Sequence, residues 1–136
     1  MTNRRNLLAF AAFGPALASA AAGKKLANVT IPAAKAQLKK EPFGDLAIYF
    51  EGPTDQIGSM TAGSLRLKAG MDPHPPHEHP EEEFLLVTEG EGEIMVDGKT
   101  SKVGPGAIMY CAANKSHHIK AGPKGPLMFY FFKWKA

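Results

Sequence analysis

From residue 46 onward the chain alternates short apolar runs with turn residues, and this alternation excludes a fold built from long helices. Apolar runs of about 4–8 residues at such regular spacing predict the strands of an all-β sandwich or barrel. The composition agrees, because 14 glycines and 11 prolines among 136 residues exceed the usual combined share of about 12%. The expected strands cover residues 46–50, 60–67, 84–88, 93–96, 107–111, 117–120 and 127–134.

One turn of this pattern can be assigned by type. Asp97 and Gly98 separate two extended runs, and both residues tolerate the positive φ that a type I′ turn requires. The flanking segments are therefore expected to form a β-hairpin. The chain length suits one domain, which we place at residues 46–136, after a Lys- and Ala-rich arm at 23–45 with a short helix over 33–40.

Residues 1–22 have the plan of a secretory signal peptide. Arg4 and Arg5 precede an apolar run over residues 7–18, and small residues such as Ala18 and Ala20 then fit a cleavage site. The run is too short for a spanning helix, which needs about 20 residues, so no permanent membrane anchor is expected. The paired arginines fit twin-arginine export as well as general secretion, and either route predicts a periplasmic or secreted protein.

The charge balance of the mature chain excludes a nucleic-acid-binding class. The formal charge of +3 includes Arg4 and Arg5, and without them 14 Lys and Arg face 13 Asp and Glu. That balance leaves no basic surface of the kind that binds phosphate backbones. Cys111 is the single cysteine, so no intramolecular disulfide can form.

All five histidines fall into two short windows. The first window holds His74, His77 and His79, with Glu83 four residues further on, and the second holds His117 and His118. Imidazole nitrogens with one carboxylate form a ligand set suited to a divalent first-row metal. Residues two apart in a strand point to the same face, so His77 and His79 can serve one ion.

These motifs resemble those of the cupin superfamily, and the resemblance covers about residues 57–133. Gly70, the His77-Glu78-His79 triplet, Glu83 and Gly90 match its first motif, while Gly104, Gly106 and His117 match its second. The resemblance implies a single small antiparallel β-barrel of the jelly-roll type around one metal ion. Its ligands would be His77, His79, Glu83 and His117. The second motif departs from the family pattern at Ala107, Ala112 and Asn114.

Several residues keep two interpretations at this point. His117 fits the motif spacing better than His118, and only one of two adjacent strand residues can enter the barrel. His74 fits either the barrel mouth or an ordinary loop. Cys111 fits a small core residue or an additional soft ligand. The aromatic residues of 129–134 fit a core or the wall of a substrate cavity, and alternation allows about half of them to face inward.

The expected function is that of an exported, mononuclear metal-binding protein. The quercetinase-like members of the family suggest a metal-dependent oxygenase for a small metal-chelated enol, diketone or phenolic substrate, with Glu83 as ligand or proton acceptor. A metal-dependent isomerase or lyase is the alternative, and a non-catalytic metal or small-ligand binding protein is a third. Fe or Mn is the expected metal, with Ni, Cu, Co or Zn as alternatives. The resemblance also implies a homodimer.

Overall fold

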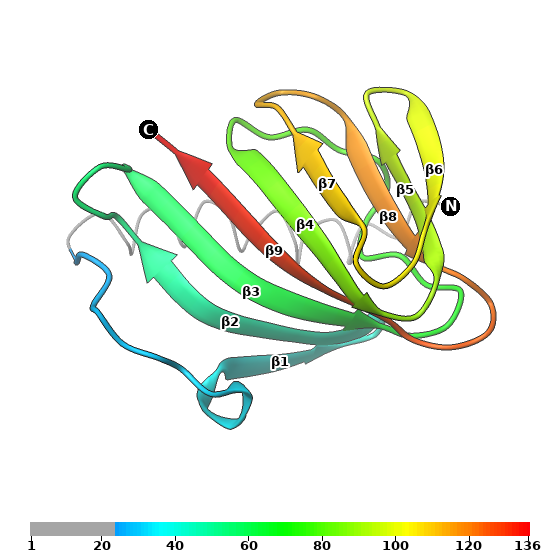
Figure 1. The fold of residues 1–136 in the computed structure, drawn as a ribbon, viewed down its shortest axis with the longest axis horizontal. Helices are drawn as coiled ribbons and strands as arrows, with labels where there is room; N and C mark the ends of the chain where they lie inside the picture. The colour runs from blue at the N-terminus through cyan, green and yellow to red at the C-terminus, as the bar shows by residue number, and fades with distance from the viewer. Residues whose placement is uncertain (1–23) are drawn as a thin grey trace.

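The computed structural model describes residues 24–136, so the predicted signal peptide lies outside the described residues. One 3-10 turn, Ala33–Lys35, precedes nine strands (Figure 1). The strands are β1 Gln37–Glu41, β2 Gly44–Gly52, β3 Ser59–Leu67, β4 Glu82–Glu89, β5 Gly92–Val96, β6 Lys99–Val103, β7 Ile108–Cys111, β8 His117–Ala121 and β9 Leu127–Lys135. Within this part of the chain no helix has the length and apolar character needed to cross a membrane.

The predicted all-β fold is confirmed: the strands form two antiparallel sheets, one of six strands in the order β1-β2-β3-β9-β4-β7 and one of three in the order β6-β5-β8. The buried cluster takes Leu46, Leu65 and Phe129 from the larger sheet and Ile94 and Ile119 from the smaller one. The hydrophobic core therefore lies between the two sheets. Polar side chains that point into the same space at one end of it can form a functional site.

The last strand shows how alternation divides its aromatic residues. In β9, Leu127, Phe129 and Phe131 are buried, whereas Phe132 on the opposite face is 39% exposed. Side chains of a strand point alternately to its two faces, so half of this aromatic run packs into the core. The other half lies on the outer face of the six-stranded sheet.

The N-terminal arm differs from its prediction. Only Ala33–Lys35 is helical, and Gln37–Glu41 forms the edge strand β1, paired with β2 from Gln37↔Ile48 to Glu41↔Gly44. A helix of about eight residues without an apolar face is marginal in water, whereas the free edge of β2 offers a hydrogen-bonding partner to every second residue. The helix predicted over 33–40 is therefore wrong beyond its first turn. Lysines on this edge strand discourage pairing with another chain.

Positive φ angles in two of the turns fall on residues that tolerate them. Asp97 has a φ of 47° and Gly98 a φ of 83°, and β5 and β6 pair directly on either side of them, which confirms the type I′ hairpin. Asn114, where the sequence departs from the family glycine, adopts a φ of 60°. Asparagine visits this left-handed region more readily than most residues, so the departure leaves the loop before β8 intact.

Candidate metal centre

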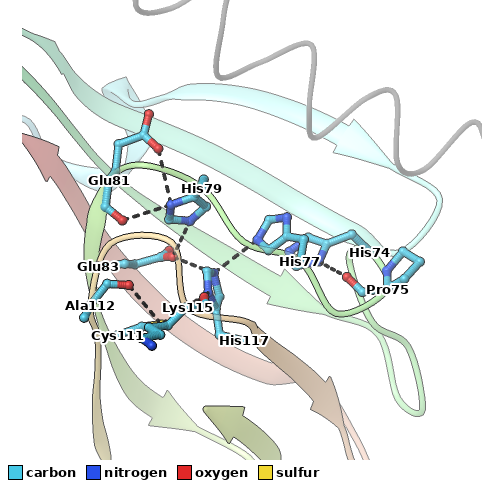
Figure 2. Close-up of polar contacts among 10 residues, drawn as sticks. All are labelled: His74, Pro75, His77, His79, Glu81, Glu83, Cys111, Ala112, Lys115 and His117. Atoms are coloured by element: carbon cyan, nitrogen blue, oxygen red, sulfur yellow. Dashed lines mark hydrogen bonds and ion pairs between the residues drawn. The ribbon is translucent and has the colours of Figure 1, made fainter. Parts of the chain in front are cut away.

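The four predicted ligands come from three separate segments that the fold brings to one end of the core. His77 and His79 lie in the loop between β3 and β4, Glu83 lies on β4 of the larger sheet, and His117 begins β8 of the smaller sheet. Figure 2 shows these side chains converging from the loop and from both sheets. The site thus forms only after the two sheets have packed together.

Backbone hydrogen bonds hold the histidine loop against β8. The amide of His77 donates to the carbonyl of His117 over 3.1 Å, and the amide of His117 donates back over 2.9 Å. Asn114 donates its amide to the carbonyl of His79 over 2.8 Å, so the left-handed turn at Asn114 also anchors the loop. These bonds fix the separation of residues that lie about forty positions apart in the sequence.

The ligand atoms form a tight cluster. His77, His79 and His117 offer ring nitrogens that all lie within 4.8 Å of one another, so the three imidazoles could hold a metal ion. His77 Nε2 and His117 Nε2 are 3.1 Å apart, and Glu83 Oε2 lies 3.0 Å from His79 Nε2 and 3.0 Å from His117 Nε2. Ligand atoms at right angles around an ion with bonds of about 2.1 Å are about 3.0 Å apart. The observed spacings fit that arrangement.

Hydrogen bonds on the far side of two rings aim their Nε2 lone pairs at the cluster. His79 Nδ1 donates to the Glu81 carbonyl over 3.0 Å, and His117 Nδ1 donates to the Lys115 carbonyl over 3.1 Å (Figure 2). A carbonyl only accepts, so each Nδ1 carries a proton; Nε2 is then an acceptor when the ring is neutral and a donor to Glu83 when the ring is protonated. When both rings are neutral, their two acceptor nitrogens and the Glu83 carboxylate repel one another unless a proton or a metal ion lies between them. The chemistry of these residues therefore fits a bound cation.

The charge state of the cluster follows from burial and from its own contacts. Burial raises the pKa of Glu83, but hydrogen bonds from His117 and His79 outweigh it and lower that pKa to about 2. Burial and the nearby imidazoles lower the pKa of His77 to about 2. At neutral pH Glu83 is therefore ionised and His77 is neutral, and these are the forms that bind a metal.

His118 and Cys111, whose roles the sequence left open, each have a defined place. His118 points away from the cluster and lies 2.8 Å from Asp72, between Nε2 and Oδ2. Cys111 is buried, and its Sγ lies 3.4 Å from Nδ1 of His117, behind the ring rather than on its Nε2 side. Cys111 therefore serves as a core residue that supports His117.

His74, which the sequence left open between the barrel mouth and an ordinary loop, lies beside the cluster. Its ring is 4% exposed and stacks on His77 with the centroids 3.6 Å apart, while its Nδ1 donates to the Pro75 carbonyl over 2.7 Å. The surrounding Pro73, Pro75 and Pro76 were the available signal, because a proline-rich loop of low flexibility can hold a side chain inward. His74 thus fixes the ring plane of His77.

Stability of the metal-free protein is expected to depend on His74 below pH 6.5. Burial lowers the pKa of His74 from 6.5 to about 4, so between these values the unfolded chain binds a proton that the folded protein excludes. Stability is then lost as the pH falls through this window, by up to about 3 kcal/mol. Urea unfolding at pH 6.5 and 4.5 should show a fall about 2 kcal/mol smaller in His74→Phe, which keeps the stacked ring. Equal falls in both proteins would contradict this account.

Comparison with known proteins identifies the fold. An RmlC-like cupin from Shewanella frigidimarina is similar with a TM-score of 0.66 at 13% identity, covering 83% of this chain and 96% of the other. KdgF from a Halomonas species is similar with a TM-score of 0.66 at 17% identity, covering 79% and 96%. At these identities the likeness concerns the fold.

Sequence comparison adds one curated relative and one family. The chain is 35% identical over 57 residues to the dimethylsulfoniopropionate lyase DddW from Ruegeria pomeroyi, and the match covers 42% of this chain and only 38% of that enzyme. The family model described as the cupin domain matches residues 63–133, slightly over half of the chain and including all four predicted ligands. This protein is therefore a member of the cupin domain family.

Proposed function

We propose that the chain is a metal-dependent lyase that acts on a small carboxylate with a leaving group at the β-carbon. The observation that carries this proposal is the 35% identity to a dimethylsulfoniopropionate lyase over 57 residues, in a chain whose three-histidine cluster could hold a metal ion. The types of ligand in the cluster agree, because elimination beside a metal-bound carboxylate needs a Lewis acid and a base and no further cofactor.

His77, His79, His117 and Glu83 would hold one divalent ion, Fe or Mn in the first instance, with Ni, Cu, Co or Zn as alternatives. Such an ion would supply Lewis-acid chemistry to a substrate oxygen. The protein side chains would orient the substrate and receive its proton. His117 and His79 are each fixed by a backbone carbonyl, which keeps the donor set in place during turnover.

Glu83 is the proposed proton acceptor. Its pKa is low because His117 and His79 donate to it, while burial alone raises it. When those nitrogens bind an ion instead, the carboxylate loses both donors, and it would accept a proton only while it is detached from the ion. In the elimination the Cα–H bond breaks and its electron pair forms the Cα–Cβ double bond. As that double bond forms, the Cβ–S bond of a sulfonium substrate breaks and its electron pair goes to sulfur, which gives a dialkyl sulfide, acrylate and a proton on Glu83.

The test of the lyase is product formation without oxygen. The full chain, reconstituted with each candidate metal in turn, is incubated anaerobically with dimethylsulfoniopropionate, and dimethyl sulfide is measured in the headspace with acrylate in solution. We expect equimolar sulfide and acrylate with at least one metal and none from the His77→Ala, His79→Ala double variant. Absence of both products with every metal would rule out this substrate.

An oxygenase is the second candidate, because three imidazoles and a carboxylate also suit a redox-active metal with open positions. It would consume oxygen with an enol, diketone or phenolic substrate and would stop anaerobically. A protein that binds metal and turns over neither class would be a binding protein. The same anaerobic and aerobic incubations therefore separate the three functions.

The proposal also includes export and self-association. Residues 1–22 would direct the chain to the periplasm or outside the cell. Phe84, Tyr110 and Phe132 lie beside one another on the outer face of the larger sheet, each between 39% and 47% exposed. Exposed apolar patches of this kind are typical of protein interfaces, which supports a homodimer.

A further inference from the structure

Three consecutive glutamates take three different places at the start of β4. Glu83 points into the cluster, whereas Glu82 accepts a hydrogen bond of 2.6 Å from the Tyr110 hydroxyl on the outer face of the sheet. This alternation is ordinary for neighbouring residues of a strand. Glu81 precedes the first residue of β4, and its carboxylate lies beside the ring of His79 (Figure 2).

Glu81 meets the ring of His79 with two of its oxygen atoms. Its backbone carbonyl accepts the hydrogen bond from Nδ1 over 3.0 Å, and its carboxylate Oε2 lies 3.2 Å from the same nitrogen. The carbonyl alone is enough to hold the proton on Nδ1 and to leave Nε2 to the cluster. The carboxylate adds a negative charge on the far side of the ring.

The contact between this charge and the ring is partly shielded from water. The side chain of Glu81 is 20% exposed and that of His79 is 15% exposed. Salt screens a partly buried pair of this kind less than it screens a pair of fully exposed groups. A carboxylate beside the outer nitrogen of a metal-binding imidazole makes the inner nitrogen more basic. Glu81 is therefore placed to strengthen the bond from His79 Nε2 to a cation.

His117 has uncharged groups in the corresponding place. Its Nδ1 donates to the Lys115 carbonyl over 3.1 Å, and the Cys111 thiol lies 3.4 Å from the same nitrogen. Both rings thus carry a proton on Nδ1, but a negative charge lies behind His79 and a carbonyl and a thiol lie behind His117. This difference makes His79 the stronger electron donor of the two.

We propose that Glu81 is a positioning residue whose carboxylate strengthens metal binding through His79. The inference goes beyond the proposed lyase and rests on the metal centre alone. A dication held by three neutral imidazoles and the Glu83 carboxylate keeps one net positive charge, which the Glu81 carboxylate balances. Removal of the Glu81 charge therefore weakens metal binding without removing a ligand.

The test measures cobalt binding by the full chain rather than turnover. Metal-free protein is titrated with Co²⁺ against a competing chelator, and the visible absorption of bound cobalt reports both affinity and donor strength. Glu81→Gln removes the charge and keeps the shape, while Glu81→Ala removes the side chain and leaves the carbonyl. Glu82→Gln is the matched control, because it removes the same charge one residue away, on the outer face of the sheet.

We expect Glu81→Gln to weaken cobalt binding by about tenfold or more and to shift the cobalt absorption band, since His79 becomes a weaker donor. Glu81→Ala should match Glu81→Gln within about threefold, because both variants keep the carbonyl that holds the Nδ1 proton. Glu82→Gln should stay within about threefold of wild type, since its charge is exposed to solvent. A carboxylate that only stabilised the fold would leave the absorption band of bound cobalt unchanged.

Two results would overturn the inference and leave the metal centre in place. One is equal cobalt affinity and absorption in wild type and Glu81→Gln, and the other is equal weakening by Glu81→Gln and Glu82→Gln. A wild-type chain that binds no cobalt would reject the metal centre and the inference together. The lyase test is separate: a weaker cobalt site in Glu81→Gln, in a protein that forms no dimethyl sulfide, would support the role of Glu81 and reject dimethylsulfoniopropionate as the substrate.

Discussion

Replacing His117 with alanine is expected to weaken metal binding by more than about 100-fold, whereas His118→Ala should retain the metal. Loss of a residue that only hydrogen-bonds to a ligand lowers metal affinity by about 10–100-fold. Loss of a ligand itself lowers the affinity further. His117 Nε2 lies 3.1 Å from His77 Nε2 and 3.0 Å from Glu83 Oε2, at the centre of the cluster. Elemental analysis of the purified variants measures the effect.

His118 is the matched control because it is the next residue of the same strand. Its ring points to the other face of β8, where Nε2 lies 2.8 Å from Asp72 Oδ2. His77→Ala should behave as His117→Ala does, since it removes another imidazole of the three. Equal metal content in the wild type and His117→Ala would reject the ligand assignment.

Gly90→Ala is expected to destabilise the fold by about 3 kcal/mol or more. Gly90 has a φ of 81°, and a Cβ built on it would lie 2.0 Å from the backbone oxygen of Pro126. Gly90 follows the end of β4 and Pro126 precedes β9, and these two strands pair in the sheet, so the clash is relieved only by moving backbone. Equilibrium denaturation in urea measures the loss.

Gly98→Ala separates the two causes of this effect. Gly98 has a similar φ of 83°, but a Cβ there meets nothing within 4 Å. The variant should lose only the conformational cost of the left-handed region, about 1–2 kcal/mol. If both variants lost the same stability, the close approach of Pro126 to Gly90 would carry no energetic weight.

The strands and turns of the core were predictable because they depend on local chemistry. The apolar run over 127–134 corresponds to β9, and the turn residues Asp97 and Gly98 adopt the expected positive φ angles. Each of these features follows from residues that are neighbours in the sequence. The edge strand Gln37–Glu41 was not predictable in this way, because it carries no apolar pattern and depends on the free edge of β2.

The candidate site likewise has features that the sequence predicts and features that it does not. The clustering and spacing of His77, His79 and Glu83 in the sequence are enough to indicate a ligand set. The stack of His74 on His77 and the position of Cys111 behind His117 were not predictable from the sequence. Both contacts join segments whose separation is set by how the loop and β8 pack.

By itself, the sequence determined the all-β class, the hairpin at residues 97–98 and the residue types available to a metal, because short-range patterning and side-chain chemistry suffice for these. Only the tertiary structure decided that His117 rather than His118 faces the cluster and that Lys133 lies opposite Glu83. Strand register sets both, and a shift of one residue would turn every side chain to the other face. Register is fixed by pairing with distant strands, which no local stretch of sequence contains.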